Sequence, residues 1–313
     1  MIAKKKGIYV FVALLVIVIS GCKNEDTSTI SGSFVGGDNG LELAFINDEP
    51  PVRVLDNNAE QFFITVSMKN KGEFTIEPGK AIVTLSGISK DQFQLDSLSK
   101  KNENQLPGVV KERTSSLEGG QDEVSFNAKF KQDLNQDFMP TISANICYAY
   151  GSRALSNVCL RRDVVRREQE GECIVDEDKK AENSGSPIQV VSLKERKAGP
   201  NEIKLIFDLQ NVGSGKPFSR TAFSSGICGE DPTKEDFVNV EVRPISNVNV
   251  RCDKFAGTGS GVVRLNSEGK ATVSCDVSTS ALQDTAFEEP LNINLDYMYK
   301  ERISKQVTVE NSF

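Results

Sequence analysis

The sequence predicts an all-β protein made of two tandem antiparallel β-sandwich domains. Apolar and polar residues alternate with a period of two in many short segments, and turn residues separate these segments. No long segment has the 3.6-residue apolar stripe of a helix, and residues 91–100 and 278–284 are suited only to short helical turns. The chain also repeats itself once, which predicts two related domains.

The N-terminus has the features of an export signal. Lys4, Lys5 and Lys6 precede an apolar segment, residues 8–19, that is too short to cross roughly 30 Å of hydrocarbon comfortably. The residues Ile-Ser-Gly-Cys at 19–22 resemble the lipobox of prokaryotic lipoproteins, in which the cysteine is lipidated and becomes the new N-terminus. The resemblance implies a signal peptide at 1–21 and a lipid at Cys22, so the protein would be membrane-anchored and face the extracytoplasmic side. An ordinary signal peptide with an incidental cysteine is the alternative.

Composition divides the rest of the chain. Residues 22–40 are rich in Ser, Thr, Gly and Asp and predict a flexible tether. Domain 1 is predicted at 41–163, a charged linker at 164–187 and domain 2 at 188–313.

Removing residues 1–21 takes three of the 37 basic residues and no acid, so 34 basic and 44 acidic side chains remain. This acidic balance argues against nucleic acid as a partner.

The repeat appears in three matched segments whose offset grows slowly along the chain. Segments beginning at residues 64, 124 and 142 match segments beginning at 205, 271 and 291. The last match contains every tyrosine of the mature chain. We expect these rings to lie in the core rather than to stack on sugars, because the chain has no tryptophan and the tyrosines sit at i and i+2 on one strand face. The tyrosines are Tyr148, Tyr150, Tyr297 and Tyr299.

Strands with one polar and one apolar face are buried economically when two sheets pack face to face, which predicts an immunoglobulin-like sandwich for each domain. A closed barrel is the alternative. Residues 148–160 are expected to form a hairpin that turns at 151–155. In each domain one strand ends in Asn-x-Gly, at Asn70 and at Asn211. We expect the asparagine side chains to bond the backbone and the glycines, Gly72 and Gly213, to accept positive φ.

The segments FFITVSMKNKGEFTIEPGK and IKLIFDLQNVGSGKPFS resemble the second strand and following turn of the CARDB group, the cell-adhesion-related immunoglobulin-like domains of bacterial and archaeal surface proteins. The resemblance covers about a third of each domain. It implies a surface-exposed β-sandwich and assigns no catalytic or binding residue.

Six cysteines remain besides Cys22, and an even number in an exported chain predicts disulfides. Two cysteines are equally far in sequence from Arg153, so they would lie opposite each other if the expected hairpin turns there. Two others lie in strands that could be neighbours and so could form a second pair. The third pair would connect the linker to domain 2 and restrict the angle between the domains. The three expected pairs are Cys147 with Cys159, Cys252 with Cys275, and Cys173 with Cys228.

Several kinds of chemistry have little support in the sequence. The chain has no histidine and no CxxC motif, which disfavours zinc and excludes His-dependent triads. GSGKP at 213–217 lacks phosphate-loop spacing, and GTGSG at 257–261 misplaces its serine for a nucleophile elbow, so both are interpreted as turns. No catalytic residue, cofactor or metal is therefore predicted.

Carboxylate pairs such as Glu288 with Glu289, or Asp231 with Glu235, are interpreted as solvated rather than as glycosidase acids. The acidic run at 176–178 lacks the ligand spacing of an EF-hand, so calcium between the domains is only an alternative.

These observations favour a non-catalytic, lipid-anchored surface protein that acts through protein–protein contacts as a structural, adhesive or accessory component, with a protein partner or self-association. The alternative is a lipoprotein that binds a ligand or polysaccharide between its two domains.

Overall fold

The computed structural model describes residues 33–113, 115–165, 173–223, 231–244 and 248–312. The predicted signal peptide, Cys22 and Cys228 lie outside these ranges. Within them the ordered elements are strands β1–β21 and three short 3₁₀ helices, η1 (Arg220–Phe223), η2 (Pro232–Lys234) and η3 (Asp253–Phe255). No helix in the described ranges is long and apolar enough to cross a membrane. The prediction of an all-β chain is confirmed.

The strands form three main sheets. The first has the order β1-β3-β9-β5 and the third has the order β11-β13-β14-β19-β17. The second is an eight-stranded sheet of order β18-β16-β20-β10-β4-β6, with β12 added beside β10 and β15 beside β20. This arrangement is consistent with β-sandwich packing.

The bounds of these strands are as follows. The first sheet contains β1 (Leu41–Phe45), β3 (Phe62–Asn70), β9 (Gln121–Phe130) and β5 (Phe93–Leu95). The eight-stranded sheet contains β18 (Ser260–Arg264), β16 (Phe237–Pro244), β20 (Phe287–Gln306), β10 (Thr141–Leu160), β4 (Ala81–Ser86), β6 (Ser99–Lys101), β12 (Glu182–Asn183) and β15 (Lys216–Phe218). The third sheet contains β11 (Asp178–Lys179), β13 (Ile188–Gly199), β14 (Glu202–Asn211), β19 (Lys270–Ser278) and β17 (Val250–Cys252).

Two small sheets complete the fold. Strand β2 (Arg53–Leu55) pairs in parallel with β21 (Thr308–Glu310) near the C-terminus, and β7 (Val110–Lys111) pairs with β8 (Ser116–Leu117). The predicted helical turns do not form within the described ranges, since 91–100 contains β5 and the start of β6, and 278–284 is the last residue of β19 followed by turn and irregular backbone.

Strands β10 and β20 are each 20 residues long and pair along their whole length, from Thr141 opposite Gln306 to Leu160 opposite Phe287. The predicted hairpin at 148–160 is therefore wrong. Gly151 suggested a turn, but its lack of a side chain instead lets the Phe74 ring pack closely against the strand. A Cβ at this position would lie 2.6 Å from that ring. The turn-like residues lie in the middle of one continuous strand.

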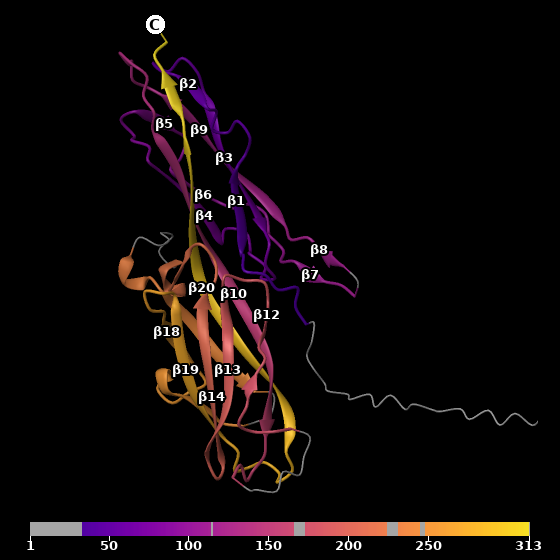
Figure 1. Ribbon diagram of the computed structural model, residues 1–313. Helices are drawn as coiled ribbons and strands as arrows, with labels where there is room; N and C mark the ends of the chain where they lie inside the picture. The colour runs from indigo at the N-terminus through magenta and orange to yellow at the C-terminus, as the bar shows by residue number, and fades with distance from the viewer. Residues whose placement is uncertain (1–32, 114, 166–172, 224–230, 245–247, 313) are drawn as a thin grey trace, which may run out of the picture.

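The two long strands join two halves of the molecule (Figure 1). The N-terminal half contains the first sheet with β4 and β6, and the C-terminal half contains the third sheet with β16 and β18. The first part of β10 pairs with β4 in the N-terminal half, and the first part of β20 pairs with β16 in the C-terminal half. Beyond the middle, each strand continues into the other half, so the predicted domain spans share one sheet. Buried side chains of both halves, such as Ile64, Tyr150 and Phe207, belong to a single core.

Candidate functional site

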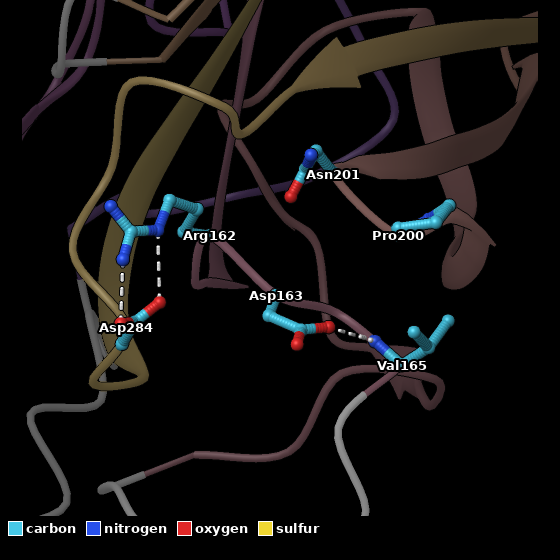
Figure 2. Close-up of a pocket in the computed structure, with 6 residues that line it drawn as sticks. All are labelled: Arg162, Asp163, Val165, Pro200, Asn201 and Asp284. Carbon is cyan, nitrogen blue, oxygen red and sulfur yellow. Dashed lines mark hydrogen bonds and ion pairs between the residues drawn. The ribbon is translucent and has the colours of Figure 1, made fainter.

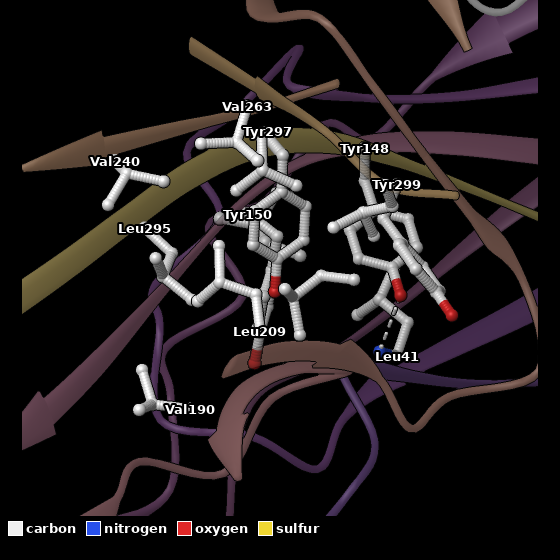
Figure 3. Packing of buried hydrophobic residues seen from close by; sticks show 14 of the residues in the cluster. Leu41, Tyr148, Tyr150, Val190, Leu209, Val240, Val263, Leu295, Tyr297 and Tyr299 are labelled. Carbon is white, nitrogen blue, oxygen red and sulfur yellow. Dashed lines mark hydrogen bonds between the residues drawn. The ribbon is translucent and has the colours of Figure 1, made fainter. Parts of the chain in front are cut away.

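Four tyrosines fill the junction between the halves (Figure 3). Tyr148 lies opposite Tyr299 and Tyr150 lies opposite Tyr297 on β10 and β20. All four side chains are at most 1% exposed, which confirms that they are core residues. Their ring centroids form a closed circuit with spacings of 5.6, 5.9, 6.1 and 6.4 Å, in the range of favourable aromatic pairs.

Each Asn-x-Gly strand end holds one tyrosine hydroxyl. Tyr150 donates to Asn70 Oδ1 at 3.2 Å, and Tyr299 donates to Asn211 Oδ1 at 3.0 Å. Both asparagines donate from Nδ2 to the carbonyl four residues on, at 2.7 Å in each case. The expected side-chain bonds to the backbone are therefore present, in equivalent form in both halves.

The explanation offered for the two glycines is wrong, because neither Gly72 nor Gly213 has positive φ. A Cβ at Gly213 would lie 2.5 Å from the Tyr299 hydroxyl oxygen, and a Cβ at Gly72 would collide with the hydroxyl of Tyr150. Glycine is needed at these positions so that the strand end can approach the buried ring.

The other two hydroxyls also occupy equivalent places. The Tyr148 hydroxyl accepts from Leu41 N at 3.2 Å and donates to Glu301 Oε2 at 2.8 Å, while Tyr297 bonds Ser152 Oγ at 2.8 Å. Burial raises the pKa of Tyr148 and of Tyr297 well above the usual phenol value. These phenols therefore stay neutral and serve packing rather than acid–base chemistry.

The chain enters the fold at this junction. Glu73 accepts from Val35 N at 3.0 Å, from Gly36 N at 3.1 Å and from Gly185 N at 2.6 Å. Its carboxylate therefore clamps the end of the predicted tether to the segment that connects the two halves. The tether joins the molecule near its middle, away from both ends of the long axis (Figure 1).

A small hairpin, made of strands β7 and β8, projects beside this entry point (Figure 1). Val110 and Leu117 are cross-strand partners, and their side chains are 53% and 54% exposed. Lys111 Nζ donates to the carbonyl of Phe34 at 3.1 Å, which ties the hairpin to the incoming chain. The sequence did not predict this feature, because residues 99–120 have no readable alternation.

The cysteines are paired differently from the sequence prediction, except at one site. The Cys252–Cys275 disulfide is present, with the two residues directly opposite on β17 and β19. Cys159 bonds Cys173, so the predicted pairs of Cys147 with Cys159 and of Cys173 with Cys228 are wrong. The pairing with Cys147 assumed a hairpin, and Cys147 and Cys159 lie instead far apart on one continuous strand. Cys147 is also disulfide-bonded.

A buried carboxylate lies beside the Cys159–Cys173 bond. Glu195 on β13 is fully buried, and both of its carboxylate oxygens accept from Cys159 N at 3.0 Å. Lys179 Nζ lies 3.3 Å from Glu195 Oε2. Burial raises the pKa of Glu195 to about 7 despite these partners. Sequence gave no signal for it, because Glu195 stands in a run of charged residues.

The far end of the C-terminal half has a polar cleft of about 610 Å³, lined by residues of the β10 end, the β13–β14 turn and the loop before β20 (Figure 2). Arg162 binds Asp284 through two bonds, Nε to Oδ1 at 2.9 Å and Nη2 to Oδ2 at 2.6 Å. The pair neutralises its own charge, and the cleft brings no set of acid, base and nucleophile together. Its lining residues are Arg162, Asp163, Val165, Pro200, Asn201 and Asp284.

The predicted carboxylate pairs have structural partners. Glu288 accepts from Asn157 Nδ2 at 3.1 Å, and Glu289, which was expected to be solvated, is only 7% exposed. Adjacent residues of a strand point to opposite faces, so these two acids do not face one cleft. Asp231 accepts from Thr233 N at 2.9 Å as a helix cap, while Glu235 pairs with Lys216.

The acidic run at 176–178 faces a cation of the protein itself, because Arg196 contacts both Asp176 and Asp178. The described residues contain no group of three or more metal-ligating side chains. Both glycine-rich segments are turns, at the start of β15 and between η3 and β18.

Comparison with known proteins yields no family model and no curated protein that matches the chain. One solved structure, the collagen adhesin (CNA) from S. aureus, aligns over 90% of this chain and 96% of its own with 8% identity and a TM-score of 0.13. A similarity of this size carries no argument about fold or function.

Proposed function

We propose that this protein is exported, is anchored to a membrane by a lipid on Cys22, and acts without catalysis by presenting surface to protein partners in the cell envelope. Its role would be structural, adhesive or accessory. The disulfides support export, since such bonds persist in oxidising compartments. The lipobox-like residues 19–22 support the anchor.

The observation that carries the proposal is the pairing of β10 with β20 over 20 residues, because it joins the two halves into one elongated body. Relative motion of the halves would require breaking this ladder and separating the four packed tyrosine rings. Such a body suits a component that keeps two surfaces at a set spacing. An anchor that enters at the middle would leave both ends available to partners.

A ligand site between the halves has less support. The rings that fill the junction are buried, and the hydroxyls of Tyr150 and Tyr299 are occupied by Asn70 and Asn211. A small molecule could enter only by displacing packed side chains. The contact surfaces of the proposal therefore lie on the outside of the molecule.

The proposal is tested by in-cell crosslinking of a C-terminally tagged protein, followed by mass spectrometry of what co-purifies. We expect a stoichiometric protein partner or ordered self-association. A clean monomer at native expression level would contradict the proposal and direct attention to small ligands and glycans.

The anchor is tested separately by labelling cells with an alkynyl fatty acid. Wild type should carry the label and sediment with membranes, and Cys22→Ser should lose both properties. Gly21→Ala, which keeps a small residue before the cysteine, is the matched control and should behave as wild type.

A further inference from the structure

We infer that the hairpin of strands β7 and β8 and the adjacent Val35 form the face of the protein that lies against the lipid surface. The inference rests on the proposed lipid anchor and adds an orientation to it. The occupant of this face is the bilayer that holds the anchor, rather than a second protein.

The first argument is the exposed apolar surface. Val110 and Leu117 face each other across β7 and β8 with about half of each side chain in solvent, and Val35 is 44% exposed. Within the described ranges, β7 and β8 pair only with each other. The hairpin therefore projects these apolar groups without burying them in the core. Exposed apolar residues that gather at one place on a surface mark an interaction site.

The second argument is the position of the anchor. The Phe34 carbonyl accepts from Lys111 of the hairpin, and Val35 N donates to Glu73, so the hairpin and the incoming chain lie side by side. Only ten residues lie between Cys22 and Ser33, so eleven Cα–Cα steps join them. Covalent geometry limits the reach of a chain of that length to less than about 40 Å, whatever its conformation. A lipid on Cys22 would hold this side of the molecule close to the bilayer.

The third argument is charge. The hairpin carries Lys111 and Arg113 against the single acid Glu112, in a mature chain that is acidic overall. Nearby, Lys69 pairs with Glu118 at 2.6 Å, and Lys71 pairs with Glu42 at 2.9 Å. With Glu73 counted, two basic and two acidic side chains balance here, so the face lacks the excess of negative charge that an anionic lipid surface would repel.

Tryptophan fluorescence provides a direct test, because the chain has no tryptophan. Leu117→Trp is expressed in the full lipidated protein and reconstituted into vesicles of phosphatidylcholine and phosphatidylglycerol, with and without brominated acyl chains. Val262→Trp is the matched control, since Val262 is 50% exposed and lies on β18 in the C-terminal half. Flotation of the vesicles reports the anchor independently.

We expect brominated lipid to quench Leu117→Trp at least twofold and to leave Val262→Trp unchanged. If brominated lipid quenches both variants to the same extent in floated vesicles, the inference is overturned while the anchor stays intact. A partner protein would then be the occupant of this face. Protein that does not float would overturn the anchor and the inference together. Val110→Trp reports from the opposite strand and replaces Leu117→Trp if that variant fails to fold.

Discussion

Ala149 of β10 lies opposite Met298 of β20, and the two residues are 149 positions apart. This offset is also the one that relates the matched strands 142–160 and 291–309 of the two halves. The pair therefore maps onto itself when one half is superposed on the other, and it marks an approximate two-fold axis through the long ladder. Both side chains are buried with Cys147 and Phe218, on the face opposite the tyrosines.

An axis at this place means that each half is completed by a strand segment from the other. The part of β10 after Ala149 pairs with the part of β20 that is bonded to β16, and the part of β20 after Met298 pairs with the part of β10 that is bonded to β4. The equivalent tyrosine contacts obey the same relation, since Tyr148 reaches Glu301 and Tyr297 reaches Ser152.

We expect the two halves to unfold as one unit. Phe207→Ala removes a fully buried ring from β14 and should cost about 3–5 kcal/mol. Hydrogen exchange followed by mass spectrometry should then show faster exchange in β3 of the other half as well as in β14. Val262→Ala, at an exposed position, should leave both regions protected as in wild type. Faster exchange confined to the C-terminal half would show that the halves unfold independently.

The close approach of Gly213 to Tyr299 predicts a rescue. Gly213→Ala should destabilise the protein by about 1–3 kcal/mol, because the new methyl group overlaps the hydroxyl. Tyr299→Phe removes that oxygen, so in denaturant unfolding Gly213→Ala should cost less in the Tyr299→Phe background than in wild type, although the Pro187 Cβ at 2.6 Å remains. Gly199→Ala is the control, since a Cβ there meets nothing closer than 3.8 Å. Additive effects of the two substitutions would contradict the steric explanation.

Local pattern in the sequence predicts the strands well but predicts their partners poorly. Alternation and the internal repeat were enough for the all-β class, for the buried tyrosines and for the Cys252–Cys275 pair, whose residues lie on strands with clear alternation. The continuity of β10 was missed because Gly151 and the polar Arg153 resemble a turn. Only the partner strand, more than a hundred residues away, shows that the ladder continues through them.

The candidate membrane face was missed for a different reason. Strands β7 and β8 contain two residues each, which is too short for a period of two to be visible. The contacts of Glu73 also could not be predicted from the sequence. Its carboxylate accepts from the backbone N–H groups of Val35, Gly36 and Gly185, which only folding brings together.

Non-reducing peptide mapping should recover Cys159 joined to Cys173. The bond closes a loop with a sequence separation of 14, for which the chain-entropy model gives a stabilisation of about 3 kcal/mol. The double variant Cys159→Ser/Cys173→Ser should lower the free energy of unfolding by a similar amount. Recovery of Cys173 in a peptide with Cys228 would contradict the observed pairing.

Glu195 predicts how stability depends on pH. Burial, the largest influence, raises its pKa from 4.5 to about 7, while Cys159 N and Lys179 act in the opposite direction. Between these two values the folded protein holds a proton that the unfolded chain has lost. The contribution of this group is therefore complete below pH 4.5 and is lost as the pH rises through 7, by about 3 kcal/mol in all. Glu177, next to β11, adds negative charge that works in the same direction as burial.

Glu195→Gln tests this dependence, because glutamine retains an acceptor for Cys159 N and cannot ionise. Denaturant titrations from pH 5 to pH 8 should show that the variant gains stability relative to wild type as the pH rises. Glu103→Gln, at an exposed position, should keep the wild-type slope. Parallel curves for wild type and Glu195→Gln would mean that Lys179 and the Cys159 amide hold the carboxylate ionised across this range, and the raised pKa of Glu195 would then be wrong.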